Sequence, residues 1–277
     1  MFDMVVRRSM IPPVRIAVLT LLLFVTFLPA QSNPWDHPGA EITELLGNTV
    51  PLSVSYDNEA GEAVTLRDVI QGPTILSLIY FNCVGTCTPM VSSMAAVLDR
   101  SDLVAGDDYH LVTLSINELD TPEMAEEKKA NYLKTMENPV PDAHWTWLTA
   151  PALSIRKLTW SIGFQFHALS NTTFAHPAGL FFLNGEGKLV RVLHGITFTE
   201  RDIRLALLEA SDPATLSLWE RAQLMMTRYN RDSATYQVRW GRIGLVALFA
   251  IGTLLVALLA SRVRRRRILL GFDIARY

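Results

Sequence analysis

Cysteine is scarce in this chain, and the scarcity limits the chemistry available. Only two cysteines occur, Cys83 and Cys87. Because structural zinc normally takes four protein ligands, a closed zinc site would need two histidines as well. A disulfide across so short a loop gains little chain entropy, so it would stabilise the fold poorly. The two sulfurs therefore favour redox or metal chemistry over a structural role.

A basic surface is also missing from the middle of the sequence. Residues 32–242 hold 16 basic and 25 acidic side chains, a formal charge of −9, although the whole chain carries only −2. Nucleic-acid binding needs a basic patch that neutralises phosphates. The glycines at 185–187 are not followed by the lysine and hydroxyl pair of a phosphate-binding loop. Nucleic acid is therefore excluded as a partner.

Internal repeats and low-complexity tracts are absent, and long apolar runs are confined to the two ends. At the start, three arginines precede an apolar run over 16–30, a pattern typical of a secretory signal. The small residue Ala30 suits cleavage, whereas Leu28 does not, so an uncleaved N-terminal anchor is the alternative. We expect residues 1–30 to be a signal peptide or anchor.

The second apolar run, over 243–260, contains no charged residue and is just long enough to span a bilayer. Five arginines follow within residues 262–267 and should stay in the cytoplasm. We therefore expect a transmembrane helix over 243–260 and a basic cytoplasmic tail over 261–277. The protein is expected in the cell membrane, single-pass, or two-pass if the signal stays. Residues 31–242 are then on the periplasmic or extracytoplasmic side.

The region between the ends predicts an α/β domain over 45–210, after a proline-broken linker over 31–44 and before a juxtamembrane segment over 211–242. Period-two and buried apolar runs predict strands over 50–55, 74–80, 109–116, 144–148, 179–183 and 188–194. Helical patterns cover 90–100, 122–135, 152–162, 199–210 and 219–229. Alternating strands and helices closed by a hairpin predict a mixed sheet with helices on both faces. With both cysteines after the first core strand, a thioredoxin-like fold is expected.

The cysteines lie where that strand turns into a helix. Cys83 and Cys87 are one helical turn apart, so their side chains can meet. A helix N-terminus favours negative charge and should lower the pKa of both thiols. The thiolate is the nucleophile in disulfide exchange and a soft metal ligand, so these residues predict a redox-active pair or a metal site.

The stretch Tyr80-Phe81-Asn82-Cys83-x-x-x-Cys87, followed by residues 120–123 (Asp-Thr-Pro-Glu) and by His176 before a Gly-rich hairpin, resembles the Sco/SenC family. The resemblance covers about residues 45–210. It implies a membrane-tethered thioredoxin-like domain that binds copper through Cys83, Cys87 and His176. It also implies a partner, the copper-centre subunit of cytochrome c oxidase or another copper or thiol protein, to which copper is delivered or whose cysteines are reduced.

This sequence departs from the family pattern at several points. Many members have Pro-Asp between the cysteines and proline directly after the second one, whereas this chain has Val84-Gly85-Thr86 and Thr88. The apolar segment at 243–260 differs from the usual single N-terminal anchor. These departures point to a divergent subgroup with a different partner, and they remove no ligand.

Other functional readings stay open at this point. Two thiolates and an imidazole suit Cu(I), and imidazole serves Cu(II) as well. A thiol–disulfide oxidoreductase would use Cys83 and Cys87 without needing His176. A peroxide-reducing or redox-sensing protein cannot be separated from it, and the plainest reading is a membrane adaptor with an incidental disulfide.

Among the remaining polar, sulfur and aromatic residues, His167 is the second candidate for the histidine ligand. The others are expected in structural roles. Met90 and Met94 should lie in the core, Asp120 and Glu123 should cap a helix, and Trp145 and Trp147 should pack inside.

Overall fold

A computed structural model describes residues 39–83 and 85–273, and it is built around a seven-stranded mixed sheet. The strand order is β2-β1-β5-β4-β3-β8-β9. The strands are β1 (Ser55–Asn58), β2 (Ala63–Thr65), β3 (Thr74–Ile79), β4 (His110–Ser115), β5 (Trp145–Thr149), β8 (Gly179–Leu183) and β9 (Leu189–His194). Strands β3, β4 and β5 are parallel, and the other neighbours are antiparallel. The predicted mixed α/β class is confirmed.

Seven α-helices are described. They are α2 (Leu66–Val69), α3 (Cys87–Arg100), α4 (Pro122–Leu133), α5 (Ala152–Ser161), α6 (Glu200–Ala210), α7 (Leu218–Met226) and α8 (Trp240–Asp273), and a short 3-10 helix, η1, covers Asp142–His144. The expected signal or anchor over residues 1–30 lies outside the described part of the chain.

The central strands form the core. Every residue of β3, β4 and β8 is buried, which explains why these strands appear in the sequence as runs rich in apolar residues without an exposed polar face. A buried hydroxyl pair, Ser77 Oγ and Thr113 Oγ1, joins β3 to β4 at 2.8 Å, and the indole N–H of Trp145 donates to Thr113 Oγ1 at 3.0 Å. Trp145 and Trp147 are fully buried, as predicted.

Helix α3 follows β3 directly and orients the cysteine-bearing turn. Its buried positions include Met90, Val91, Met94 and Leu98, which recur at helical spacing and pack into the core. Met90 and Met94 are therefore core residues, as expected. A long buried face fixes the rotation of α3 about its axis, and this places the first residue, Cys87, inside the protein.

The strand predicted over 50–55 is wrong. The segment there is irregular, and the first strand of the sheet, β1, begins only at Ser55. The reason is local: the N–H of Val50 donates to the carbonyl of Gly187 at 2.9 Å in an isolated bridge between Thr49 and Lys188, and Pro51 has no N–H with which to extend it.

Two hairpins carry no clear signal in the sequence. One joins β6 (His167–Ala168) to β7 (Phe174–Ala175), and the other joins β10 (Thr227–Asn230) to β11 (Thr235–Val238). Such short strands show too little periodicity to detect. The helix expected over 219–229 ends at Met226, where β10 begins.

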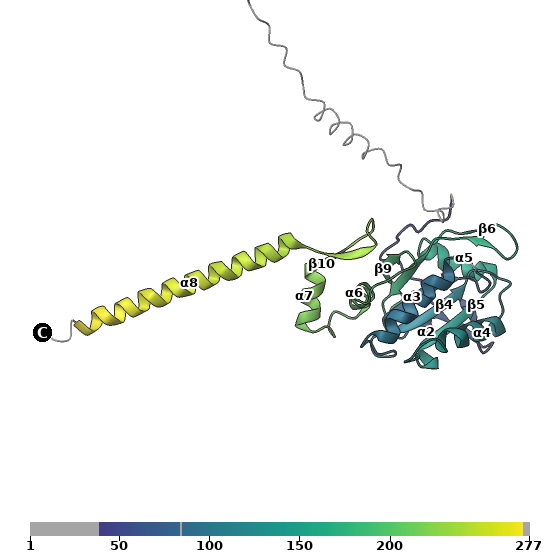
Figure 1. Ribbon diagram of the computed structural model, residues 1–277, viewed down its shortest axis with the longest axis horizontal. Helices are drawn as coiled ribbons and strands as arrows, with labels where there is room; N and C mark the ends of the chain where they lie inside the picture. Colours follow the sequence, from purple (N-terminus) through teal and green to yellow (C-terminus); the bar gives the residue numbers. More distant parts are fainter. Residues whose placement is uncertain (1–38, 84, 274–277) are drawn as a thin grey trace, which may run out of the picture. The chain divides into compact units, whose positions relative to one another are not determined.

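Helix α8 is the long yellow helix of Figure 1. Its part Trp240–Arg262 contains an 18-residue stretch with a mean hydropathy of 2.7 and no buried residue, so it is long and apolar enough to cross a membrane. It contains the apolar run predicted over 243–260.

Candidate metal centre

The two cysteines lie on the turn between β3 and α3. Strand β3 ends at Ile79, and Cys87 is the first residue of α3. Both side chains are free thiols and both are buried, Cys87 at 2% exposure and Cys83 at 9%. Cys83 is therefore the more accessible residue of the pair.

His176 approaches the same point from a distant part of the chain. It follows β7 and is 8% exposed. Its Nε2 lies 3.0 Å from Cys87 Sγ, across 89 residues of sequence. The two sulfurs and one imidazole nitrogen all lie within 4.8 Å of one another. The three residues named at the sequence level are thus brought together, with donor atoms close enough to share one metal ion.

The His176 ring is held in a defined orientation. Its Nδ1 lies 2.9 Å from the carbonyl oxygen of Pro177, and a carbonyl can only accept, so Nδ1 carries the proton. The lone pair of Nε2 therefore faces Cys87. A hydrogen bond of this kind fixes the tautomer and raises the basicity of a ligating imidazole.

Aromatic rings surround the imidazole. Tyr80 meets it edge-on with ring centroids 5.7 Å apart, and Phe164 lies 6.1 Å away. Phe174 in turn packs on Tyr80 at 5.3 Å. Burial raises the pKa of Tyr80 to about 12, so its hydroxyl stays protonated beside the thiols at neutral pH. These rings exclude water from one side of the cluster.

The two thiols differ in acidity. A hydrogen bond from the Cys87 side chain, together with backbone N–H groups of the turn, lowers the pKa of Cys83 to about 4. Burial raises the pKa of Cys87 well above its usual range. The expectation that both pKa values are lowered therefore holds in direction for Cys83 only, where hydrogen bonds are the main cause, whereas desolvation raises the pKa of Cys87.

Asp120 fixes the approach to the cysteine turn, a role that sequence reasoning missed. Its carboxylate accepts from the N–H of Phe81 at 2.7 Å, from Ser115 Oγ at 2.6 Å and from Asn117 Nδ2 at 2.8 Å. The helix cap is Thr121, which accepts from the N–H of Met124, so Asp120 does not cap α4. The available signal was its place after β4, since adjacent parallel strands end at the same edge of a sheet.

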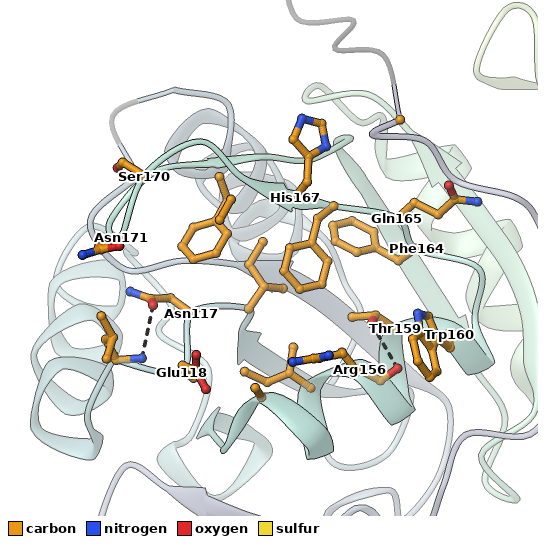
Figure 2. A pocket seen from close by; sticks show the side chains of 18 residues that line it. Asn117, Glu118, Arg156, Thr159, Trp160, Phe164, Gln165, His167, Ser170 and Asn171 are labelled. Atoms are coloured by element: carbon orange, nitrogen blue, oxygen red, sulfur yellow. Dashed lines mark hydrogen bonds between the residues drawn. The ribbon is translucent and has the colours of Figure 1, made fainter.

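Glu123 lies in the first turn of α4, where its charge favours the helix N-terminus. The alternative ligand His167 lies on β6 and is not part of the cluster of three. It lines a neighbouring cavity of about 650 Å³ instead. Figure 2 shows Arg156, Trp160 and Phe164 around this cavity. Phe164 also contacts His176, so the cavity and the candidate metal centre share a wall.

Comparison with known proteins identifies a matching family. The sequence profile of the SCO1/SenC family matches residues 52–207, which lie within the predicted domain. A search of curated proteins finds no match.

Solved structures also match. A candidate electron transfer protein from Aquifex aeolicus VF5 is 23% identical, with a TM-score of 0.53 over 60% of this chain and 94% of its own. A SCO1/SenC family lipoprotein from Bacillus anthracis str. Ames is 21% identical, with a TM-score of 0.49 over 59% and 95%. Copper-bound ScoI of Arabidopsis thaliana is 19% identical, with a TM-score of 0.46 over 59% and 97%. The likeness to the first structure shows a shared fold, the expected thioredoxin-like one.

Proposed function

The chain belongs to the SCO1/SenC family, and from this premise we propose that it is a membrane-anchored copper chaperone. Cys83, Cys87 and His176 hold copper as cargo in this proposal. One observation carries it: two sulfurs and an imidazole nitrogen lie within 4.8 Å of one another, and the imidazole lone pair faces the sulfurs.

The chemistry of the three donors supports copper over other ions. Soft thiolates select Cu(I), and imidazole suits both Cu(I) and Cu(II). A ligating thiol must lose its proton, and burial raises the pKa of Cys87, so copper uptake competes with protons for this sulfur. Copper affinity is therefore expected to rise with pH. Cys83 is the more exposed of the two cysteines, so a partner would exchange the ion from its side of the site.

The proposal extends to partner and location. The family supports a role in assembling the copper centre of cytochrome c oxidase, with the copper-centre subunit or another copper or thiol protein as recipient. The apolar helix Trp240–Arg262 supports membrane attachment. The arginine run after it supports a cytoplasmic C-terminus and a domain on the periplasmic or extracytoplasmic side.

Titration with Cu(I) tests the site. The reduced full chain in neutral detergent should compete with a chromophoric Cu(I) chelator and bind one equivalent. Cys83→Ser should abolish this binding, and His176→Ala should lower the affinity about tenfold or more, because one of three donors is lost. His167→Ala is the matched control and should bind like the native chain. Absence of tight binding by the reduced native chain would overturn the proposal.

A second function has one observation in its favour, the contrast between the two thiols. Cys83 is the more exposed and its pKa is lowered, whereas burial raises the pKa of Cys87. Cys83 could attack a partner disulfide, forming a mixed disulfide and releasing one partner thiolate. Cys87, on losing its proton, would then attack Cys83 Sγ, which frees the reduced partner and leaves a Cys83–Cys87 disulfide. This reaction needs no metal, so a His176→Ala chain that reduces a model disulfide at the native rate in excess chelator would favour it.

A further inference from the structure

The hairpin β10–β11 packs against the domain and is not a flexible linker. The rings of Tyr229 and Tyr236 meet edge-on with centroids 5.3 Å apart, and both are buried. The N–H of Tyr236 donates to Asp202 on α6 at 2.8 Å, and the N–H of His194 on β9 donates to the Tyr229 hydroxyl at 3.0 Å. The guanidinium of Arg191 lies over both rings, 5.5 Å and 5.9 Å from their centroids. Anything that binds this hairpin therefore also positions the domain.

A cavity of about 1160 Å³ lies against this hairpin, and its lining is rich in arginine. Three acidic residues face five arginines there, namely Glu44, Glu209 and Asp232 against Arg191, Arg228, Arg231, Arg239 and Arg242. The cavity thus has more positive than negative groups, in a domain that is acidic as a whole.

Ion pairs inside the cavity neutralise only part of that positive charge. Arg191 is bonded to Glu209 at 2.6 Å. Arg231 lies 3.8 Å from Glu44, whose nearer partner is His194 at 2.6 Å. Within residues 39–83 and 85–262, the side chains of Arg228 and Arg239 form no ion pair and no hydrogen bond. Both are therefore available to an anion from outside the chain.

The cavity lies next to the start of α8, and this location indicates which anions can reach it. Gly241, Arg242 and Leu245, from the first turns of α8, are part of the lining. The apolar part of α8, Trp240–Arg262, is about 35 Å long and covers a hydrocarbon core of about 30 Å, so its first turn reaches the lipid headgroups. Trp240 is 74% exposed there. Tryptophan is enriched at that depth of a membrane.

Exposed apolar side chains on the preceding helix support the same placement. On α7, Leu218 is 85% exposed and Trp219 is 66% exposed, and Met225 is exposed as well. Such side chains next to a membrane span are suited to the apolar edge of the headgroup region.

We propose that the arginine cavity formed by β10, β11 and the start of α8 binds the phosphate of an anionic phospholipid. Arg228 and Arg239 are the principal contacts, because the planar fork of arginine matches phosphate oxygens in pairs. The site depends on α8 crossing a membrane and is independent of copper binding, so either proposal can fail alone. Phospholipid binding in this cavity holds the thioredoxin-like domain on the bilayer surface.

Native mass spectrometry of the full chain in neutral detergent tests this proposal. The probes are phosphatidylglycerol and phosphatidylcholine with identical acyl chains. Phosphatidylglycerol adducts should form at concentrations at least tenfold lower. Arg228→Gln/Arg239→Gln should remove that preference, whereas Arg228→Lys/Arg239→Lys should keep part of it. Arg242 is left unchanged because it donates to the Met225 carbonyl and so supports the fold.

The matched control is Arg67→Gln/Arg100→Gln, which removes two exposed arginines from α2 and α3 and should bind phosphatidylglycerol like the native chain. Equal binding of both lipids by the native chain would overturn the proposal, and so would a glutamine variant that keeps the native preference or a lysine variant that keeps none. Displacement of phosphatidylglycerol by millimolar inorganic phosphate would also overturn it, because the site would then take free anions.

Discussion

At the scale of single residues, Asp120 shows how a carboxylate can serve a site that it does not touch. Its three hydrogen bonds join the N–H before the cysteine turn to the loop after β4. A buried carboxylate that accepts three bonds is stable only while all its donors are in place. Asp120 therefore positions the cysteines through the backbone at Phe81.

We expect Asp120→Asn to destabilise the fold by about 1–3 kcal/mol, because an amide cannot accept from all three donors. Copper affinity should fall about 10- to 100-fold, as is typical when a residue that orients the ligands is lost. Chemical denaturation and the Cu(I) titration measure the two effects. Asp107→Asn, at an exposed position, should change neither. A variant that loses stability but keeps native affinity would show that Asp120 supports the fold alone.

At the scale of elements, burial decided which features could be predicted. The strands β3, β4, β8 and β9 and the helices α3, α5 and α6 leave long apolar patterns in the sequence. The hairpins β6–β7 and β10–β11 do not, because strands of two to four residues are too short to show a period. His176 could be selected only through a family resemblance, because its spacing from Cys87 says nothing about β7, which brings it to 3.0 Å.

The end of α5 offers a prediction at this scale. Gly163 has φ of +72°, and a Cβ there would clash with the carbonyl oxygen of Thr43. We expect Gly163→Ala to cost at least about 3 kcal/mol, because backbone must shift as well as adopt a strained φ. Gly61 has φ of +76° with nothing within 4 Å. Gly61→Ala should therefore cost only about 1 kcal/mol. Thermal unfolding of both variants measures the contrast, and equal losses would contradict it.

At the scale of the whole molecule, an acidic α/β domain is joined to the apolar helix α8 by a segment that is itself folded. The juxtamembrane segment expected over 211–242 contains α7 and the fastened hairpin, so few residues are left to act as a flexible tether. Composition predicted the apolar helix well, because an uncharged run of that length has few other uses. Composition could not predict that the hairpin β10–β11 packs against the domain, because this contact depends on Tyr229 and Tyr236.

Extraction of membranes with alkaline carbonate tests the anchor. The full chain should remain in the pellet, since a spanning helix is not released by charge or salt. A chain ending at Val238 keeps the hairpin but lacks α8, and it should move to the supernatant. If the shortened chain stays in the pellet, the N-terminal apolar run has been retained as a second anchor.

The wide separation in sequence between Cys87 and His176 has a thermodynamic consequence. An ion held by both would act as a cross-link between α3 and the segment after β7, and it would bind the native chain far better than the unfolded one. Mass action then adds roughly 4 kcal/mol to the unfolding free energy when free ion exceeds its dissociation constant about 1,000-fold. Cargo and fold would be coupled, so a recipient that withdraws the ion would leave behind a domain easier to melt and to digest.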